Sequence, residues 1–201
     1  MQRKIYLATA LVAALSLPVV AYGQTTPEQR LAILNAHNEK RALHCVPPLA
    51  GSDLLATNAQ TWANGCHKDA NGFFTHQPRN PNGENLSSGW ATSNGVPILP
   101  AQSPEEAVRG WYSEISAYNF NNPLLTNANG HFTQVVWRAS TQLGCAQATC
   151  PVSTDPCFSP TVPCNPSITV PGTLWVCEYS PPGNFNATPA TLRLNVPRPC
   201  N

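Results

Sequence analysis

Apolar residues recur at three- and four-residue steps in three segments of the chain, which is the period of a helix with one buried face. The first segment follows Thr26 and extends to about Leu43, the second follows Ser52, and the third follows Ser103. Serine and threonine are common N-caps, because their hydroxyl oxygens accept hydrogen bonds from the first backbone N–H groups of a helix. The pattern therefore predicts three helices with defined starts.

Shorter runs of β-branched and aromatic residues predict strands at residues 132–137, 143–148 and 174–179. Because the helices precede the strands, we expect an α+β fold in which helices cover an antiparallel sheet. Residues 70–102 contain glycine, asparagine and proline throughout and are predicted as a long loop with at most one short helix. The proline-rich residues at about 151–172 are predicted to form a surface insertion, because proline is unsuited to helix interiors and central strands.

Residues 1–23 have the pattern of a secretory signal peptide. Two basic residues precede an apolar run that ends at Val20, and the small residues Ala21 and Gly23 fit a cleavage site. The run is shorter than the ~20 residues that span a bilayer. We expect cleavage after Gly23 and secretion of residues 24–201 as one extracellular domain without stable membrane insertion. An uncleaved amino-terminal anchor is the alternative.

Charge is scarce in this chain of 201 residues, because only 10% of its residues are charged and its 11 basic and 10 acidic side chains nearly balance. Soluble domains carry about 25% charged residues, so the composition argues against a charge-rich disordered tail and against a long basic surface. Cleavage of the signal peptide removes two basic residues and leaves no excess of positive charge for membrane binding. We therefore expect a monomer with no nucleic-acid partner.

Eight cysteines lie beyond the expected signal peptide. In a secreted protein an even number of cysteines is typical of a disulfide framework. A zinc site is the alternative, but the chain has no CxxC pair, and its cysteine spacings are looser than those of structural zinc sites. Eight cysteines allow on the order of a hundred pairings, so the residue pattern leaves their connectivity open.

The chain lacks the GxSxG, HExxH and phosphate-loop motifs of common hydrolases and nucleotide-binding proteins. Four other residues are candidates for a site: His76 and Glu84 in the expected long loop, Glu114 after the third helix begins, and His131 at the start of the first expected strand. Two imidazoles with carboxylate oxygens suit Zn²⁺ or a similar divalent cation. The alternative is a metal-free hub in which these side chains bond to each other and order the loop.

Other polar residues have simpler interpretations. His37, Arg41 and His44 on the first helix are expected to be capping or surface groups rather than ligands. Asn85 and Asn186 each begin an Asn-X-Ser/Thr sequence, which accepts an N-linked glycan if the host modifies it.

The segment from Gly130 to Ser140, GHFTQVVWRAS, is similar over its whole length to the most diagnostic motif of the CAP superfamily. This superfamily groups cysteine-rich secretory proteins, insect venom antigens and plant pathogenesis-related proteins, which share the SCP domain. The resemblance covers residues 27–185. Glu178 departs from it, because the family usually has an uncharged polar residue there, and the proline-rich insertion is not a common family feature. Shorter matches occur at residues 37–41, 83–86, 111–114, 143–146 and 177–184.

The resemblance implies a disulfide-stabilised, three-layer α/β/α sandwich with an antiparallel central sheet and a central cleft. Two histidines and two acidic residues line this cleft in the family, and they correspond here to His76, Glu84, Glu114 and His131. In this interpretation His76 and His131 are the residues that would bind a metal ion.

Disulfide pairs follow in part from the same resemblance. It implies two of the pairs, and the remaining four cysteines are then paired by elimination. The expected pairs are Cys66–Cys150 and Cys145–Cys177 by resemblance, and Cys157–Cys164 and Cys45–Cys200 by elimination.

Members of the superfamily bind sterols or fatty acids and act in defence, virulence or host interaction. The resemblance thus implies a secreted lipid-binding module, and it favours binding over catalysis without excluding an enzyme. An apolar stretch within residues 86–102 fits this function, because its large side chains lie among glycines and prolines and could cover a lipid. We call four of these residues the lipid loop: Trp90, Val96, Ile98 and Leu99.

A metal-dependent hydrolase, either a peptidase or an esterase, is the alternative function for the same cleft. His76 and His131 would hold a metal-bound water, while Glu84 or Glu114 would act as general base. No nucleophile or oxyanion site can be identified in the sequence, so lipid binding is the favoured interpretation.

Overall fold

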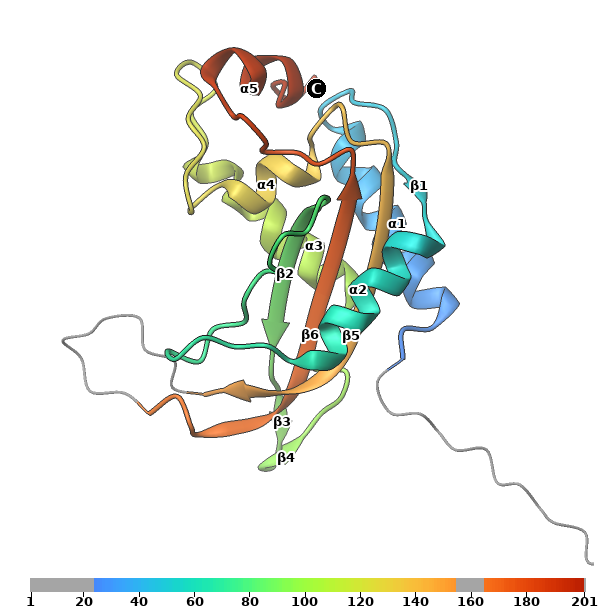
Figure 1. The fold of residues 1–201 in the computed structure, drawn as a ribbon, viewed down its shortest axis with the longest axis vertical. Helices are drawn as coiled ribbons and strands as arrows, with labels where there is room; N and C mark the ends of the chain where they lie inside the picture. The colour runs from blue at the N-terminus through green and yellow to red at the C-terminus, as the bar shows by residue number, and fades with distance from the viewer. Residues whose placement is uncertain (1–23, 155–164, 201) are drawn as a thin grey trace, which may run out of the picture.

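The computed structural model describes residues 24–154 and 165–200. The expected signal peptide at residues 1–23 and the expected Cys157–Cys164 pair lie outside these ranges. Within them, helices cover both faces of a four-stranded sheet, and a small two-stranded hairpin lies at one end (Figure 1). No helix in the described part of the chain is long and apolar enough to cross a membrane.

The three helices predicted from the sequence are confirmed. They are α1 (Pro27–Ala42), α2 (Asp53–Gly65) and α3 (Pro104–Ser113). At α1 the Thr26 hydroxyl accepts the N–H of Gln29, and the Gln29 side chain accepts the N–H of Thr26. Ser103 and Glu106 form the same reciprocal cap at α3. Such caps satisfy donors that a helix leaves unpaired, and they depend only on neighbouring residues.

The sheet has the strand order β1-β5-β6-β2. Its strands are β1 (Ala50–Gly51), β2 (Gly83–Gly89), β5 (Gln142–Ser153) and β6 (Thr169–Ser180). The strands predicted at residues 143–148 and 174–179 are confirmed as parts of β5 and β6. All neighbouring strands are antiparallel except the short β1, which pairs in parallel with β5.

Side chains alternate along β5 and β6 and supply two separate cores. On one face Cys145, Trp175 and Tyr179 pack with residues of α1 and α3, and on the other face Ala146 and Val176 pack with residues of α2. Figure 1 shows α2 in front of the two long strands and α1 and α3 behind them. The molecule is therefore the three-layer α/β/α sandwich that the resemblance implied.

The strand predicted at residues 132–137 is wrong, because this segment forms the helix α4 (Gly130–Val135). Phe132, Val135 and Val136 are all fully buried, and a short run of buried apolar residues looks the same in a helix as in a buried strand. The guanidinium of Arg41 donates to the carbonyls of Val135 and Trp137 at the end of α4. A distant residue on α1 thus helps to fix this short helix.

The long loop predicted at residues 70–102 is wrong in part, because it contains β2 and the hairpin of β3 (Thr92–Ser93) and β4 (Val96–Pro97). β2 is the edge strand beside β6, and its polar side chains show no alternation that would reveal a strand. Its conformation comes from backbone pairing with β6, which the side-chain pattern does not report.

The proline-rich insertion is shorter than predicted, because β5 extends to Ser153 and β6 begins at Thr169. Pro151 faces Pro171 across the ladder. This pair lies beyond the residues that contact β1 or β2, so the missing N–H groups remove no bond to a third strand.

Disulfides join elements that lie far apart in the sequence. The three expected pairs that fall within the described residues are confirmed: Cys45–Cys200, Cys66–Cys150 and Cys145–Cys177. They attach the carboxyl terminus to the end of α1, the end of α2 to β5, and β5 to β6. Such bonds persist in oxidising compartments.

Candidate functional site

The four expected cleft residues form two His–Glu pairs. Nδ1 of His76 lies 2.6 Å from Oε1 of Glu84, and Nδ1 of His131 lies 2.7 Å from Oε1 of Glu114. Each pair joins two elements: a loop after α2 with the edge strand β2, and the first turn of α4 with the 3₁₀ helix η1 (Glu114–Ala117). The fold thus brings together residues that are eight and seventeen positions apart.

Backbone N–H groups orient both carboxylates. Oε2 of Glu114 accepts the N–H of His131 at 2.9 Å and that of Phe132 at 3.1 Å, so Glu114 caps α4 from another element. Oε1 of Glu84 accepts the N–H of Gln77 at 3.1 Å. Because each carboxylate oxygen accepts hydrogen bonds, Nδ1 of each neutral imidazole carries the proton. In the described residues Nε2 of neither ring has a hydrogen-bond partner, so a lone pair is available there.

A polar pocket of about 560 Å³ lies beside these pairs. His76, Glu84, Asn85, His131 and Asn184 contribute to its lining, together with residues 125–127 and 130. The His76 side chain is 61% exposed and that of Glu84 is only 4% exposed, so the imidazole is the group that a ligand would meet. Glu84 therefore acts mainly through His76.

A second, apolar pocket of about 430 Å³ shares both histidines with the polar pocket. Its wall includes the apolar side chains of Phe73, Phe74, Leu86, Trp90, Val152 and Leu174. These residues come from the loop after α2, from β2 and the residue after it, from the end of β5 and from the middle of β6. The two histidines therefore line both pockets, with mostly polar residues around them in one pocket and most of the large apolar side chains in the other.

The lipid loop divides between the apolar pocket and the surface. Trp90 borders the pocket, whereas Val96, Ile98 and Leu99 do not. All four side chains are largely exposed, at 46%, 65%, 46% and 40% in chain order. Val96 lies on the hairpin β3–β4, which is at one end of the sheet (Figure 1), and the other three residues flank the hairpin along the chain.

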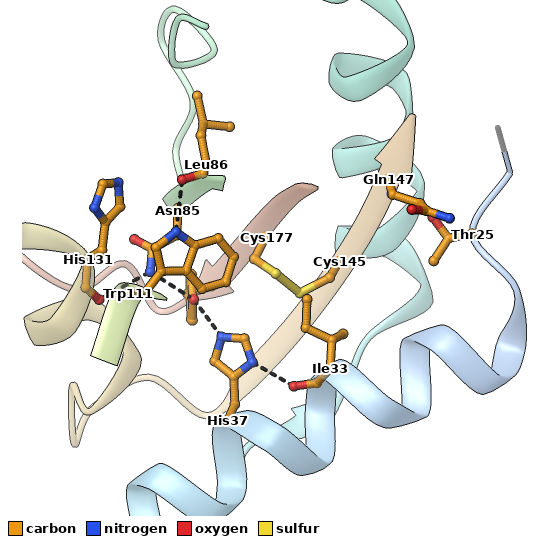
Figure 2. The surroundings of a disulfide bond; sticks show 11 residues. Thr25, Ile33, His37, Asn85, Leu86, Trp111, His131, Cys145, Gln147 and Cys177 are labelled. Carbon is orange, nitrogen blue, oxygen red and sulfur yellow. Dashed lines mark hydrogen bonds between the residues drawn. A yellow bond between two sulfur atoms is a disulfide. The ribbon is translucent and has the colours of Figure 1, made fainter. Parts of the chain in front are cut away.

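A buried network supports His131 from the helical layer, and the interpretation of His37 as a capping or surface group is wrong. His37 is fully buried, donates from Nδ1 to the carbonyl of Ile33, and accepts at Nε2 from the Tyr179 hydroxyl at 2.7 Å. The Asn85 amide donates to the same hydroxyl and to the carbonyl of His131, each at 3.1 Å. Figure 2 shows this chain of contacts from α1 to the cleft. Burial lowers the pKa of His37 to about 4.

Arg41 and His44 are also buried, against the expectation of surface groups. Arg41 donates to four backbone carbonyls, and its burial lowers its pKa to about 10. His44 contacts the carbonyl of Pro197 and the hydroxyl of Tyr112, and burial lowers its pKa. A signal was present in the sequence, because His37 and Arg41 follow the buried Ile33 at four-residue steps and so share its helix face.

Glu178, the residue that departs from the family pattern, is fully buried directly across the ladder from Glu84. Its Oε2 accepts from the Asn82 amide at 2.8 Å, and its Oε1 has no hydrogen-bond partner. Burial raises the pKa of this carboxyl, and the nearby Glu84 raises it further. Through this hydrogen bond to Asn82, Glu178 holds the loop between His76 and β2 against the sheet.

The fold and the cleft define a class of protein: a disulfide-stabilised α/β/α sandwich in which two histidines, each hydrogen-bonded to a glutamate, line a cleft at the edge of the sheet. The model of the cysteine-rich secretory protein family, called CAP, matches residues 34–179. The chain belongs to this family, so the resemblance stated for its motifs is confirmed.

Similar proteins occur in fungi and plants. The protein named Repressed by EFG1 protein 1 from Candida albicans is 40% identical over 156 residues, which are 76% of this chain and 45% of that protein. Pathogenesis-related protein 1 of Arabidopsis thaliana is 33% identical over 183 residues, which are 91% of this chain and 92% of that protein. The chain thus spans less than half of the fungal relative and nearly all of the plant relative.

A solved structure with the same fold is that of BmVAL-1. It is 28% identical in sequence, superposes with a TM-score of 0.57, and the match covers 81% of each chain. The likeness confirms the three-layer fold.

Proposed function

We propose that this protein is a secreted lipid-binding module that takes a sterol or a fatty acid into the cleft and acts in defence, virulence or host interaction. One observation carries the proposal: the lining of the apolar pocket includes both cleft histidines and Trp90 of the lipid loop. An amphipathic ligand likewise combines one polar group with a large apolar part.

The size of the apolar pocket supports a small ligand. Its volume of about 430 Å³ falls within the range of roughly 300–1,000 Å³ that is usual for small-molecule sites. Burial of about 200 Å² of lipid surface, at about 25 cal/mol per Å², would contribute roughly 5 kcal/mol before ordering costs. Micromolar affinity is therefore expected.

The polar group of the ligand would meet the two imidazoles. With Nδ1 held by a glutamate, Nε2 of a neutral ring accepts a hydrogen bond from a hydroxyl, and a protonated ring donates one to a carboxylate. A sterol hydroxyl and a fatty-acid carboxylate are thus both compatible with the site.

The same two imidazoles suit a divalent cation such as Zn²⁺, but they supply only two ligands. The free Nε2 atoms are suitable ligands, and Glu84 and Glu114 fix the tautomers as carboxylates do behind zinc-bound histidines. The described residues contain no group of three or more His, Cys, Asp or Glu side chains that could hold a metal ion. His76 and His131 would therefore bind the ion weakly, with water completing its coordination.

A metal-dependent hydrolase is the second candidate. The hydrogen bond from Nδ1 to a carboxylate favours it, because this contact orients the ring and leaves Nε2 with the free lone pair that a general base needs. A bound cation would supply polarisation of a water molecule or a carbonyl group. Glu84 itself is only 4% exposed, so a role as general base would pass through His76.

Ligand titration separates the two functions. The secreted protein would be titrated with a labelled sterol and a labelled fatty acid, and assayed for peptide and ester hydrolysis with added zinc. We expect saturable binding that Trp90→Ala weakens about tenfold, because loss of part of an indole contact costs about 1–2 kcal/mol. Leu99→Asp should weaken it less, since Leu99 does not border the pocket.

Leu54→Ala is the matched control, because Leu54 is a 71% exposed apolar residue on α2 that does not border the pocket. Binding by this variant should equal that of the unmodified protein. Zinc-dependent turnover that Glu84→Gln abolishes, with no lipid bound, would instead establish the hydrolase.

A further inference from the structure

Three Asn-X-Ser/Thr sequences occur in the chain, and they differ in how well each could accept an N-linked glycan. One of them, Asn165-Pro166-Ser167, has proline in its middle position, which excludes it as an acceptor of N-linked glycans. The other two begin at Asn85 and Asn186 and satisfy the acceptor rule equally well. The sequence alone therefore cannot rank them.

Asn85 is unsuitable for a glycan in the folded protein. It lies on β2, is 1% exposed, and uses its Nδ2 for hydrogen bonds to the carbonyl of His131 and the hydroxyl of Tyr179. Nδ2 is the atom to which a sugar would be attached. A glycan there would replace one of the two N–H donors and would have to occupy the space between the strand and the helical layer (Figure 2). A chain modified at Asn85 could not complete this fold.

Asn186 has the opposite surroundings. It is exposed, it lies in the turn between β6 and α5 (Pro189–Asn195), and its φ is 48°. Its carbonyl accepts hydrogen bonds from Thr188 and Thr191, whereas its side chain makes none in the described part of the chain. Nδ2 is therefore free, and a sugar attached to it would extend into solvent without breaking any contact.

We propose that the exported protein carries an N-linked glycan on Asn186 and none on Asn85. In this reaction Nδ2 of Asn186 bonds to C1 of the first sugar of a lipid-linked oligosaccharide. The bond between that C1 and its phosphate oxygen breaks, the lipid pyrophosphate leaves, and Nδ2 loses one proton. The proposal depends on export through a compartment that contains this donor, which the expected signal peptide would provide.

The place of Asn186 in the fold gives the glycan a defined position relative to the lipid loop. α5 lies at one end of the long axis of the molecule, and the hairpin β3–β4 lies at the other (Figure 1). The neighbouring Phe185 is 71% exposed, so a glycan on Asn186 would cover an apolar side chain. It would leave the exposed residues of the lipid loop open to a ligand.

Glycopeptide mapping tests the proposal. The full chain with its own leader would be secreted from a eukaryotic host, and the purified protein treated with peptide N-glycosidase in ¹⁸O water, which marks each formerly glycosylated asparagine as labelled aspartate. We expect the label at residue 186 and unlabelled asparagine at residue 85. A glycan on Asn85 of the secreted protein, an unmodified Asn186, or retention of the chain inside the cell would each overturn the proposal.

Matched variants separate the two positions. Asn186→Gln should remove the whole glycan-dependent shift in electrophoretic mobility. Ser87→Ala removes the acceptor sequence at Asn85 but keeps both contacts of Asn85, and this variant should keep the full shift. Thr188→Ser preserves both the acceptor sequence and the hydroxyl that caps α5, so it should also keep the shift.

Lipid titration of the glycosylated and deglycosylated protein provides an independent readout. The two affinities should agree within about twofold, because no described residue after Leu174 borders the apolar pocket, and Asn184, two residues from Asn186, borders the polar pocket and not the apolar one. A larger difference would contradict the position assigned to the glycan. If neither form binds lipid, the proposed function fails while the glycan assignment still stands on the peptide map.

Discussion

The two His–Glu pairs of the cleft contain the same hydrogen bond but are held by different kinds of structure. Glu114 accepts two backbone N–H groups of α4 in addition to the ring of His131. In the described chain Glu84 accepts one backbone N–H, from the loop that carries His76. The His131 side chain is 33% exposed and that of His76 is 61% exposed. One pair thus belongs to a helix packed in the core, and the other holds a surface loop to an edge strand.

The buried polar side chains next to each pair also differ. Those next to His131 are more completely hydrogen-bonded than the one next to Glu84. Beneath His131, the contacts of Asn85, Tyr179 and His37 form a chain in which each of these side chains has partners. Beneath Glu84, the buried Glu178 has one oxygen without a partner. Complete polar networks rigidify a structure, whereas incomplete ones do not. We therefore expect His76, and not His131, to move when a ligand binds.

The largest expected effect is the pH dependence of stability caused by His37, which supports His131 through Tyr179 and Asn85. Burial lowers the pKa of His37 to about 4, whereas histidine in an unfolded chain has a pKa of about 6.5. Between these values the unfolded chain binds a proton that the folded chain does not. The contribution is therefore complete above about pH 6.5 and is lost as the pH falls towards 4, by about 3 kcal/mol in total. Urea unfolding at pH 7 and pH 4.5 would measure this loss.

His37→Gln is the comparison variant for that experiment, because glutamine is polar but does not titrate. Its stability should depend much less on pH in this window. Equal pH dependence in the two proteins would show that His37 is not the responsible group.

The second prediction compares the two carboxylates directly. Glu114→Ala should lower the free energy of unfolding by about 2 kcal/mol, because α4 loses its cap and His131 loses its partner. Glu84→Ala should cost about 1 kcal/mol, because the exposed His76 can bond to water instead. Denaturant titrations would measure both values, and equal losses would contradict the distinction between a core pair and a loop pair.

The third prediction concerns how Glu178, which lies across the ladder from Glu84, affects stability. Burial raises the pKa of Glu178, so this carboxyl favours folding in its protonated form and becomes less favourable as the pH rises above the value of an unfolded chain, about 4.3. Glu178→Gln keeps an acceptor for Asn82 and cannot become charged. It should raise stability at pH 7 by less than Glu114→Ala lowers it, and should have no effect below about pH 4.

Glu39→Gln is the control for Glu178→Gln, because Glu39 is exposed on α1. Thermal unfolding across pH 3 to pH 8 would show little change for this variant. A loss of stability in Glu178→Gln at pH 7 would mean that the negative charge stabilises the loop.

The smallest expected effect on stability is that of removing both imidazoles. The double variant His76→Ala, His131→Ala should lose zinc binding in calorimetry while its thermal midpoint in metal-free buffer falls less than that of Glu114→Ala, since neither ring is fully buried and the α4 cap is kept. Zinc affinity of the unmodified protein should weaken in acid, because protonated imidazoles do not bind metals. A large drop of the thermal midpoint would instead favour the metal-free polar hub.

Local signals in the sequence were sufficient for part of the fold. The starts of α1, α2 and α3 follow from caps that involve only neighbouring residues. The four cleft residues followed from motifs, and so did two of the disulfides. α4 and β2 were missed, because the first depends on Arg41 of α1 and the second on pairing with β6.

The sequence by itself determined the helix starts, the two long strands, the identity of the cleft residues and the family. Only the tertiary structure decided which histidine pairs with which glutamate, that His37 and Arg41 are buried, and that Asn85 is enclosed while Asn186 is free. It also decided that one apolar pocket joins both histidines to Trp90. The physical reason is distance along the chain, because these contacts join residues from separate elements, and residue spacing encodes only what lies within a few positions.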